Sequence, residues 1–129
     1  LTTGASPVTL FNTVGTIIAK VFAASSTALT PTADNGTLAV GIAGNTGMYL
    51  AAATINTTNF PAAQATAWAG DTSPTLLGEV LSGSALNWFL IGNGVDIIAT
   101  IATNDMTAGA STFYCEYIPL DSSSTVVAA

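Results

Sequence analysis

The charged side chains and the thiol are the first candidates for chemistry in this sequence, and they comprise seven carboxylates, one amine and one cysteine. The carboxylates belong to Asp34, Asp71, Glu79, Asp96, Asp105, Glu116 and Asp121. Histidine is absent from the 129 residues, which excludes a histidine general base, a histidine-containing triad and a histidine metal ligand.

The acids show no spacing that specifies a catalytic or metal site. Asp96 and Glu116 fall on neighbouring predicted strands, where they would resemble the paired carboxylates of a glycosidase, but that chemistry needs a cleft and the sequence predicts none. The D-x-D-x-D-G spacing of a calcium loop is missing. We interpret the acids as solvated charges, and we expect no catalytic residue, no cofactor and no metal site. The protein is predicted not to be an enzyme.

The thiol and the aromatic rings have structural interpretations. Cys115 is the only cysteine, so an intrachain disulfide is excluded. It alternates with aromatic residues in Phe113-Tyr114-Cys115-Glu116-Tyr117, a pattern typical of a small residue buried in a strand. A platform for sugar binding is one interpretation of the aromatic residues, and packing in the core or at an interface is the other. The residues considered for such a platform are Phe11, Tyr49, Phe60, Trp68 and Trp88.

The charge balance excludes several classes of partner. Lys20 is the only basic residue and the formal net charge is −6, so neither nucleic-acid phosphates nor anionic lipid headgroups can be neutralised. The apolar runs Thr16–Ala24 and Val95–Ala102 are too short for a membrane span, which needs about 20 residues. The sequence given shows no signal-peptide pattern. We therefore expect no nucleic-acid partner and no membrane.

Charged residues are also too few for an ordinary free subunit. They make up 6% of the chain, against roughly 25% in a typical soluble domain. A chain of this mass exposes roughly 6,300 Å² when folded, which leaves about one charge per 800 Å². We expect neighbouring subunits to cover part of that surface, in a homo-oligomer such as a dimer or trimer.

The pattern of residues predicts strands throughout. β-branched and aromatic runs alternate with turn signals such as Asp34-Asn35-Gly36 and Gly92-Asn93-Gly94. We predict an all-β fold, an antiparallel β-sandwich of jelly-roll-like or barrel-like form, in one domain over residues 1–129. Residues 1–12 and 121–129 are expected as extended arms. The expected strands are Thr16–Ala23, Leu38–Ile42, Met48–Ala53, a short one around Thr66–Trp68, Leu76–Leu81, Leu86–Ile91, Val95–Thr103 and Thr112–Ile118.

The last three of these strands are predicted to form an antiparallel meander, with residues 104–110 as the loop before the final strand. Period-two alternation places seven residues on one buried sheet face. They are Val95, Ile97, Ala99, Ile101, Phe113, Cys115 and Tyr117. The long polar segment Asn56–Thr75 and the two chain ends are almost free of charge and rich in small residues, so we expect them to contact neighbouring proteins. On this interpretation, replacing Ala63 and Ala65 with Lys would weaken such contacts.

The C-terminal part of the chain carries a resemblance to a known class of proteins. Three consecutive pieces carry it: the strand Gly94–Thr103, the loop Asp105–Gly109, and the strand Thr112–Asp121, which ends in Tyr117-Ile118-Pro119-Leu120-Asp121. This pattern resembles small virion structural proteins of tailed bacteriophages, whose last strands end in an aromatic-x-Pro-Leu-Ser/Asp motif. The resemblance implies a β-rich capsid decoration or cement protein that assembles as trimers or dimers on the capsid surface, with the major capsid protein or neighbouring shell subunits as partners.

Two other functions are consistent with the same sequence. A receptor- or carbohydrate-binding β-sandwich on a virion or cell surface would use an exposed aromatic cluster near Asn and Asp. A secreted filament or surface-layer subunit would use the same charge-poor surface. The expected function is the first: a non-enzymatic virion subunit that stabilises a shell through protein–protein contacts.

Overall fold

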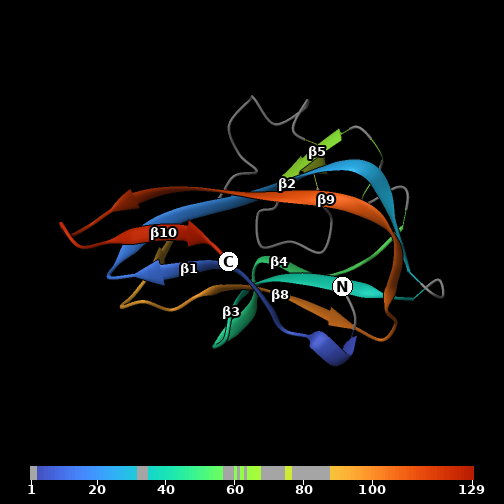
Figure 1. The fold of residues 1–129 in the computed structure, drawn as a ribbon, viewed down its shortest axis with the longest axis horizontal. Coiled ribbons are helices and arrows are strands. Elements are labelled where there is room, and N and C mark those ends of the chain that lie inside the picture. Colours follow the sequence, from blue (N-terminus) through green and yellow to red (C-terminus); the bar gives the residue numbers. More distant parts are fainter. Residues whose placement is uncertain are drawn as a thin grey trace.

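The computed structural model of the chain describes residues 3–31, 35–56, 60, 62, 64–67, 75–76 and 88–129. These residues form two antiparallel sheets that pack face to face as a β-sandwich (Figure 1). Sheet A has the strand order β10-β1-β8-β3-β4, and sheet B has the order β6-β5-β2-β7, with β9 paired along β2. A short 3-10 helix, Thr3–Ala5, precedes the first strand. The strands are β1 (Val8–Val14), β2 (Ile17–Pro31), β3 (Thr37–Ile42), β4 (Asn45–Thr54), β5 (Gln64–Ala67), β6 (Thr75–Leu76), β7 (Phe89–Ile91), β8 (Ile97–Ala102), β9 (Met106–Pro119) and β10 (Thr125–Ala128).

β2 is the central strand of sheet B and pairs along most of its length with β9, and in Figure 1 this two-stranded ribbon runs above β10, β1 and β8 of sheet A. The register is regular from Ile17↔Pro119 to Ser25↔Ser111, and it then shifts at three places up to Pro31↔Met106. On the other side of β2, β7 pairs with its first residues and β5 pairs further along. Burial alternates along β2 from Ile17 to Ser25, as the period of two in a strand requires.

The core lies between the two sheets and is built from aliphatic and aromatic side chains of both. Tyr49 of β4 lies fully buried in it, and its hydroxyl donates a hydrogen bond of 3.1 Å to the carbonyl of Ala19 on β2. The Tyr49 ring also meets Phe89 of β7 edge to face. One side chain thus joins the two layers through a hydrogen bond and through packing. The largest fully buried side chains of the core include Tyr49, Phe60, Ile17, Leu38, Leu50 and Ile97.

Three chain crossings between the sheets meet at one end of the sandwich. The first is the corner between β1 and β2 at Gly15, whose φ of +70° suits glycine. In the second, between β7 and β8, the amide of Gly94 donates to the Gly15 carbonyl at 2.8 Å. In the third, between β9 and β10, the Ser124 hydroxyl donates to the Thr16 carbonyl at 2.8 Å. These hydrogen bonds satisfy backbone groups that have no partner strand at the points where the chain passes from one sheet to the other.

The predicted all-β antiparallel sandwich is confirmed, but the predicted C-terminal meander is wrong. β7 and β9 pair with β2 in sheet B, whereas β8 pairs with β1 and β3 in sheet A. The tight turn before β8 does form, with positive φ at Asn93 (49°) and Gly94 (72°), as in a type I′ turn. It does not close a hairpin, because Thr13 of β1 binds the residues that follow it. The Thr13 hydroxyl donates to the Val95 carbonyl at 2.7 Å, and the Thr13 amide donates to Asp96 at 2.9 Å.

The chain ends are strands of sheet A rather than extended arms. Residues 8–12 belong to β1, which pairs with β8 on one side and with β10 on the other. Residues 125–128 form β10, in the register Phe11↔Ala128 to Val14↔Thr125. Both segments are rich in the β-branched residues Val and Thr, which favour strands, and each strand satisfies the backbone groups of the other.

The seven residues predicted to share a sheet face all contact the core, but they do so from two sheets. Ile97, Ala99 and Ile101 of β8 are buried in sheet A, and Val95 packs beside them. The three residues of β9, Phe113, Cys115 and Tyr117, pack partly buried against the same core from sheet B. The loop expected over residues 104–110 is shorter, because β9 begins at Met106. Of the expected strand Leu76–Leu81, residues 77–81 lie outside the described residues, as do residues 86 and 87.

Candidate interaction surface

The outer face of sheet B carries a regular array of large side chains. We define the sheet-B outer face by Ile18, Lys20 and Phe22 of β2, Trp88 and Leu90 at β7, and Tyr114, Glu116 and Ile118 of β9. The array follows from strand periodicity. Even-numbered residues of β2 point away from the core, and the register places the even-numbered residues of β9 directly opposite them.

An ion pair lies in the middle row of this face. The Lys20 ammonium lies 2.6 Å from a carboxylate oxygen of Glu116 and 4.8 Å from the centre of the Trp88 ring. The Lys20 side chain is 17% exposed, whereas that of Glu116 is 59% exposed. The cation is thus covered by the aromatic ring and the carboxylate. The sheet-B outer face as a whole has no net charge.

Apolar rows flank the ion pair on both sides. On one side Ile18 lies between Leu90 and Ile118 in the strand register. On the other side Phe22 stacks on Tyr114, with ring centres 5.2 Å apart and planes 15° from parallel. Four large members of the face, Trp88, Tyr114, Ile118 and Leu90, are between 40% and 62% exposed. Exposed aromatic and aliphatic groups in one continuous patch are a common mark of a protein–protein contact.

The outer face of sheet A carries a second, smaller apolar area beside the chain ends. Val14 of β1 and Val127 of β10 are both largely exposed. The pairing of Asn12 with Val127 and of Val14 with Thr125 places these four residues on the same face. We call them the chain-end face. None of its four residues is charged.

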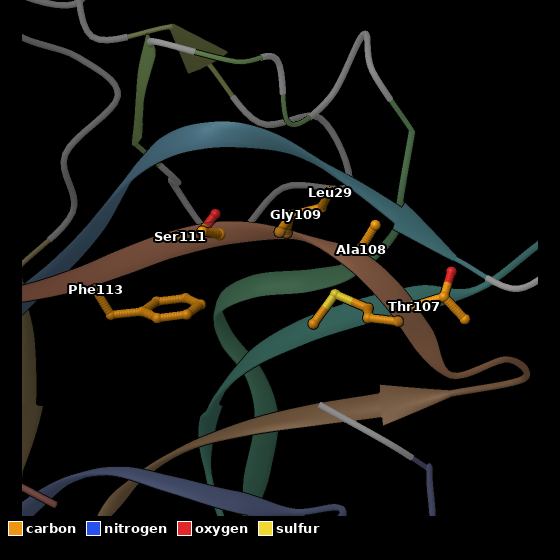
Figure 2. Close-up of a pocket in the computed structure, with 8 residues that line it drawn as sticks. Leu29, Thr107, Ala108, Gly109, Ser111 and Phe113 are labelled. Atoms are coloured by element: carbon orange, nitrogen blue, oxygen red, sulfur yellow. The ribbon is translucent and has the colours of Figure 1, made fainter.

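A pocket of about 360 Å³ lies along β9, where its pairing with β2 becomes irregular (Figure 2). Its lining runs along β9 from Met106 to Phe113, with Leu29 of β2 beside Gly109. Gly109 has a φ of +105°, and a Cβ there would collide with the carbonyl of Ala28. The bend in β9 at this point therefore requires glycine. None of the described residues that line the pocket is titratable, so these residues offer no acid, base or thiolate to a bound molecule.

The acids singled out in the sequence do not gather in the described part of the chain. Asp96 accepts a hydrogen bond from the Thr13 amide next to β1, whereas Glu116 binds Lys20 on sheet B, so they do not form the carboxylate pair considered from the sequence. Asp105 precedes β9. Asp34, Asp71 and Glu79 lie outside the described residues. Within the described ranges no three acidic or cysteine side chains approach one another closely enough to hold a metal ion.

Asp121 organises the turn between β9 and β10. One of its carboxylate oxygens accepts hydrogen bonds from the Ser123 hydroxyl at 2.6 Å and from the Ser123 amide at 2.9 Å. The other accepts from the Thr16 amide at 3.3 Å. Hydrogen bonding from the side chain of Ser123, then from that of Ser124, and from the amides of Ser123 and Thr16 lowers the pKa of Asp121 to about 2. The carboxylate therefore acts as an anchor of the corner at which three chain crossings meet.

The remaining candidate residues are mostly structural. Cys115 packs half-buried against the core, and burial raises the pKa of its thiol to about 11, which keeps it protonated near neutral pH. Tyr49, Phe60 and Phe11 are core residues, so they cannot line a sugar-binding platform. Trp88 is exposed, and Trp68 lies outside the described residues.

The sheet-B outer face was missed at the level of sequence, although a signal for it is present. In Thr16–Ala23 the odd positions hold Ile17, Ala19 and Val21, and the even positions hold Ile18, Lys20 and Phe22. A strand that is apolar on both faces is typical of a segment covered on both sides. The larger side chains belong to the outer face, and this is visible only once the inner face is known.

The segment expected to contact neighbouring proteins is described only in part. Residues 57–59, 61, 63 and 68–74 lie outside the described residues. The expectation that Lys in place of Ala63 would weaken contacts with neighbouring proteins therefore also falls outside them. β5 fulfils the expected short strand by pairing Gln64–Ala67 with β2.

Comparison with protein-family models, with curated proteins and with solved structures gives no match. In the described ranges no helix has the length and apolar character needed to cross a membrane.

Proposed function

We propose that this chain is a non-enzymatic virion structural protein, a capsid decoration or cement subunit that stabilises a phage shell through protein–protein contacts. The observation that carries the proposal is the combination of exposed apolar side chains on the outer faces of both sheets with very few charges in the chain. Such a surface loses little by desolvation when other subunits cover it. The resemblance of the C-terminal strands to tailed-phage virion proteins points to the same role.

The chain-end face is the proposed contact with the shell. Val14 and Val127 expose apolar surface there, and the neighbours Asn12 and Thr125 are polar but uncharged. The two strands that carry these residues pair with each other, so the face is held by a regular ladder. An uncharged face of this kind can lie on another protein without leaving an unpaired ion at the contact.

The test compares the thermal stability of purified particles that carry the wild-type protein, the Val127→Lys variant or no added protein. Because Val127 is exposed, the variant is expected to fold normally, while its cation must be desolvated at the contact. We expect wild-type protein to raise the melting temperature of the particles and the variant to bind poorly. Equal melting in all three samples would refute the cement function. Normal binding of the variant would refute the assignment of this face.

A carbohydrate-binding β-sandwich is the second candidate, and the exposure of Trp88 and Tyr114 favours it. Sugars stack on free aromatic faces. One face of each ring is already occupied here, because Phe22 stacks on Tyr114 and the Lys20 ammonium lies over Trp88. The cement function is therefore preferred. Binding of the isolated protein to a glycan array, abolished by Tyr114→Ala and unaffected by Val127→Lys, would reverse that preference.

A further inference from the structure

We infer that the sheet-B outer face binds a second copy of this chain about a two-fold axis, with Lys20 of each copy meeting the partner's Glu116. The inference rests on the proposed function to the extent that both describe a subunit working in an assembly. It concerns a different surface from the chain-end face and a different partner from the shell. It can therefore be tested on isolated protein in solution.

The charge pattern is the first argument for a second copy. The face carries one cation and one anion side by side, at 2.6 Å. A two-fold rotation through this middle row places the cation of each copy beside the anion of the other, so the face is electrically complementary to itself. The two ion pairs then form a network of alternating charges, in which each carboxylate has two cations nearby.

The composition of the chain restricts the alternatives. Lys20 is its only basic residue, so no other basic side chain of a second copy can meet the exposed Glu116 carboxylate. A head-to-tail contact between different faces would leave that carboxylate facing a neutral or acidic surface. Each copy also has a formal charge of −6, so copies repel one another over most orientations. The sheet-B outer face, with one cation and one anion, adds no net charge to that repulsion.

The available area fits a reversible dimer. The exposed parts of Tyr114 and Trp88 amount to roughly 100 Å² each. With Leu90 and Ile118 the patch falls in the range of about 300–600 Å² found for the largest patch of many monomers. A standard stable interface buries about 800 Å² per partner. The patch supplies about half of that, and the partly buried Ile18, Lys20 and Phe22 and the exposed Glu116 contribute to the rest. We therefore expect association that depends on concentration rather than an obligate dimer.

A charge-swap experiment tests the proposed pairing. Sedimentation of the wild-type protein over a wide concentration series is compared with Lys20→Glu, with Glu116→Lys, and with an equimolar mixture of the two variants. Each variant alone presents two like charges on the face, so we expect its self-association to fall by roughly a hundredfold or more. In the mixture a doubly acidic face meets a doubly basic one, and association is expected to return. A purely intrachain role of the ion pair cannot produce that rescue, because neither chain regains its own pair.

A second pair of variants covers the case in which a charge variant does not fold. Leu90→Ser removes an apolar side chain that is 62% exposed on the sheet-B outer face, and Val127→Ser does the same at 61% exposure on the chain-end face. A symmetric contact contains the substituted residue twice. We expect Leu90→Ser to weaken self-association by roughly tenfold and Val127→Ser to leave it unchanged.

The outcomes separate this inference from the proposed function. A wild-type protein that remains monomeric at the highest concentration, or a mixture of charge variants that associates no better than each variant alone, overturns the inference. Neither result bears on particle stabilisation, which the Val127→Lys variant tests. Loss of particle binding in Leu90→Ser without any wild-type self-association would assign the sheet-B outer face to the shell and would also overturn the inference.

Discussion

Tyr49→Phe is a direct test of how the two sheets are joined. Tyr49 is fully buried between them, its hydroxyl donates to the Ala19 carbonyl on the opposite sheet at 3.1 Å, and its ring meets Phe89 edge to face. Replacement by Phe removes one oxygen and keeps the ring, so the contact with Phe89 and the volume of the core are retained. The change isolates the hydrogen bond between the layers.

The expected loss is about 1 kcal/mol, the usual net contribution of a buried neutral hydrogen bond. For a chain of this length the entropy of unfolding converts that loss into a fall in melting temperature of roughly 4 °C. Equilibrium unfolding in urea, followed by fluorescence, measures the free energy directly. Tyr114→Phe is the matched control, because that tyrosine is 45% exposed on the outer face. Removal of its hydroxyl is expected to cost under about 0.5 kcal/mol.

Wild type and Tyr49→Phe are also expected to differ in how their stability depends on pH in alkaline solution. Burial, with a smaller contribution from the charge of Cys115, raises the pKa of Tyr49 above its ordinary value of 10.0. A raised pKa means that the folded state resists ionisation, so the stabilisation is complete below pH 10 and is lost as the pH rises further. We expect the advantage of wild type over Tyr49→Phe to shrink above pH 10. Cys115 titrates in both proteins and cancels in the comparison. A variant as stable as wild type at neutral pH would refute the interlayer bond.

Three further changes probe the core, the bend in β9 and the corner. Ile97 is fully buried, so Ile97→Ala is expected to lower the free energy of unfolding in urea by about 3–4 kcal/mol. Phe113 is half-buried beside the pocket, so Phe113→Ala is expected to lower it by only about 1–2 kcal/mol. Equal losses of stability would contradict the difference in burial between the two sites. Gly109→Ala is expected to lower the free energy of unfolding by about 2–3 kcal/mol, because Gly109 has a φ of +105° and a Cβ there would collide with the Ala28 carbonyl. Gly44→Ala is the control and is expected to be nearly neutral, because a Cβ at Gly44 would meet open space. Asp121 has a pKa lowered from 3.8 to about 2, so the stability it contributes is present above pH 4 and is lost as the pH falls towards 2. The difference in melting temperature between wild type and Asp121→Asn should therefore close over that interval, and a difference that is independent of pH would count against the anchor.

Much of the fold class follows from local patterns. Alternation along Thr16–Ala23, Val95–Thr103 and Thr112–Ile118 predicts strands, and the structure places strands over most of each range. The Asn93-Gly94 signal predicts a tight turn, and both residues have positive φ. Such features depend on a few neighbouring residues, through steric limits on φ and ψ and through the period of two in a strand. They hold whichever strands finally pair.

Strand pairing and the choice of inner face depend on contacts far apart in the sequence. The turn at Asn93 does not close a hairpin, because Thr13, more than eighty residues earlier, binds the next two residues of the chain. The ends expected as arms are strands because β1 and β10 satisfy each other's backbone groups. Alternation in β2 separates two apolar faces without saying which one is buried. The tertiary structure decides this, because large side chains such as Tyr49 of sheet A fill the space above Ala19 and leave Ile18 and Phe22 on the outer face. The candidate interaction surface is the outcome of that choice, since the packing between sheets determines which apolar side chains remain for a partner.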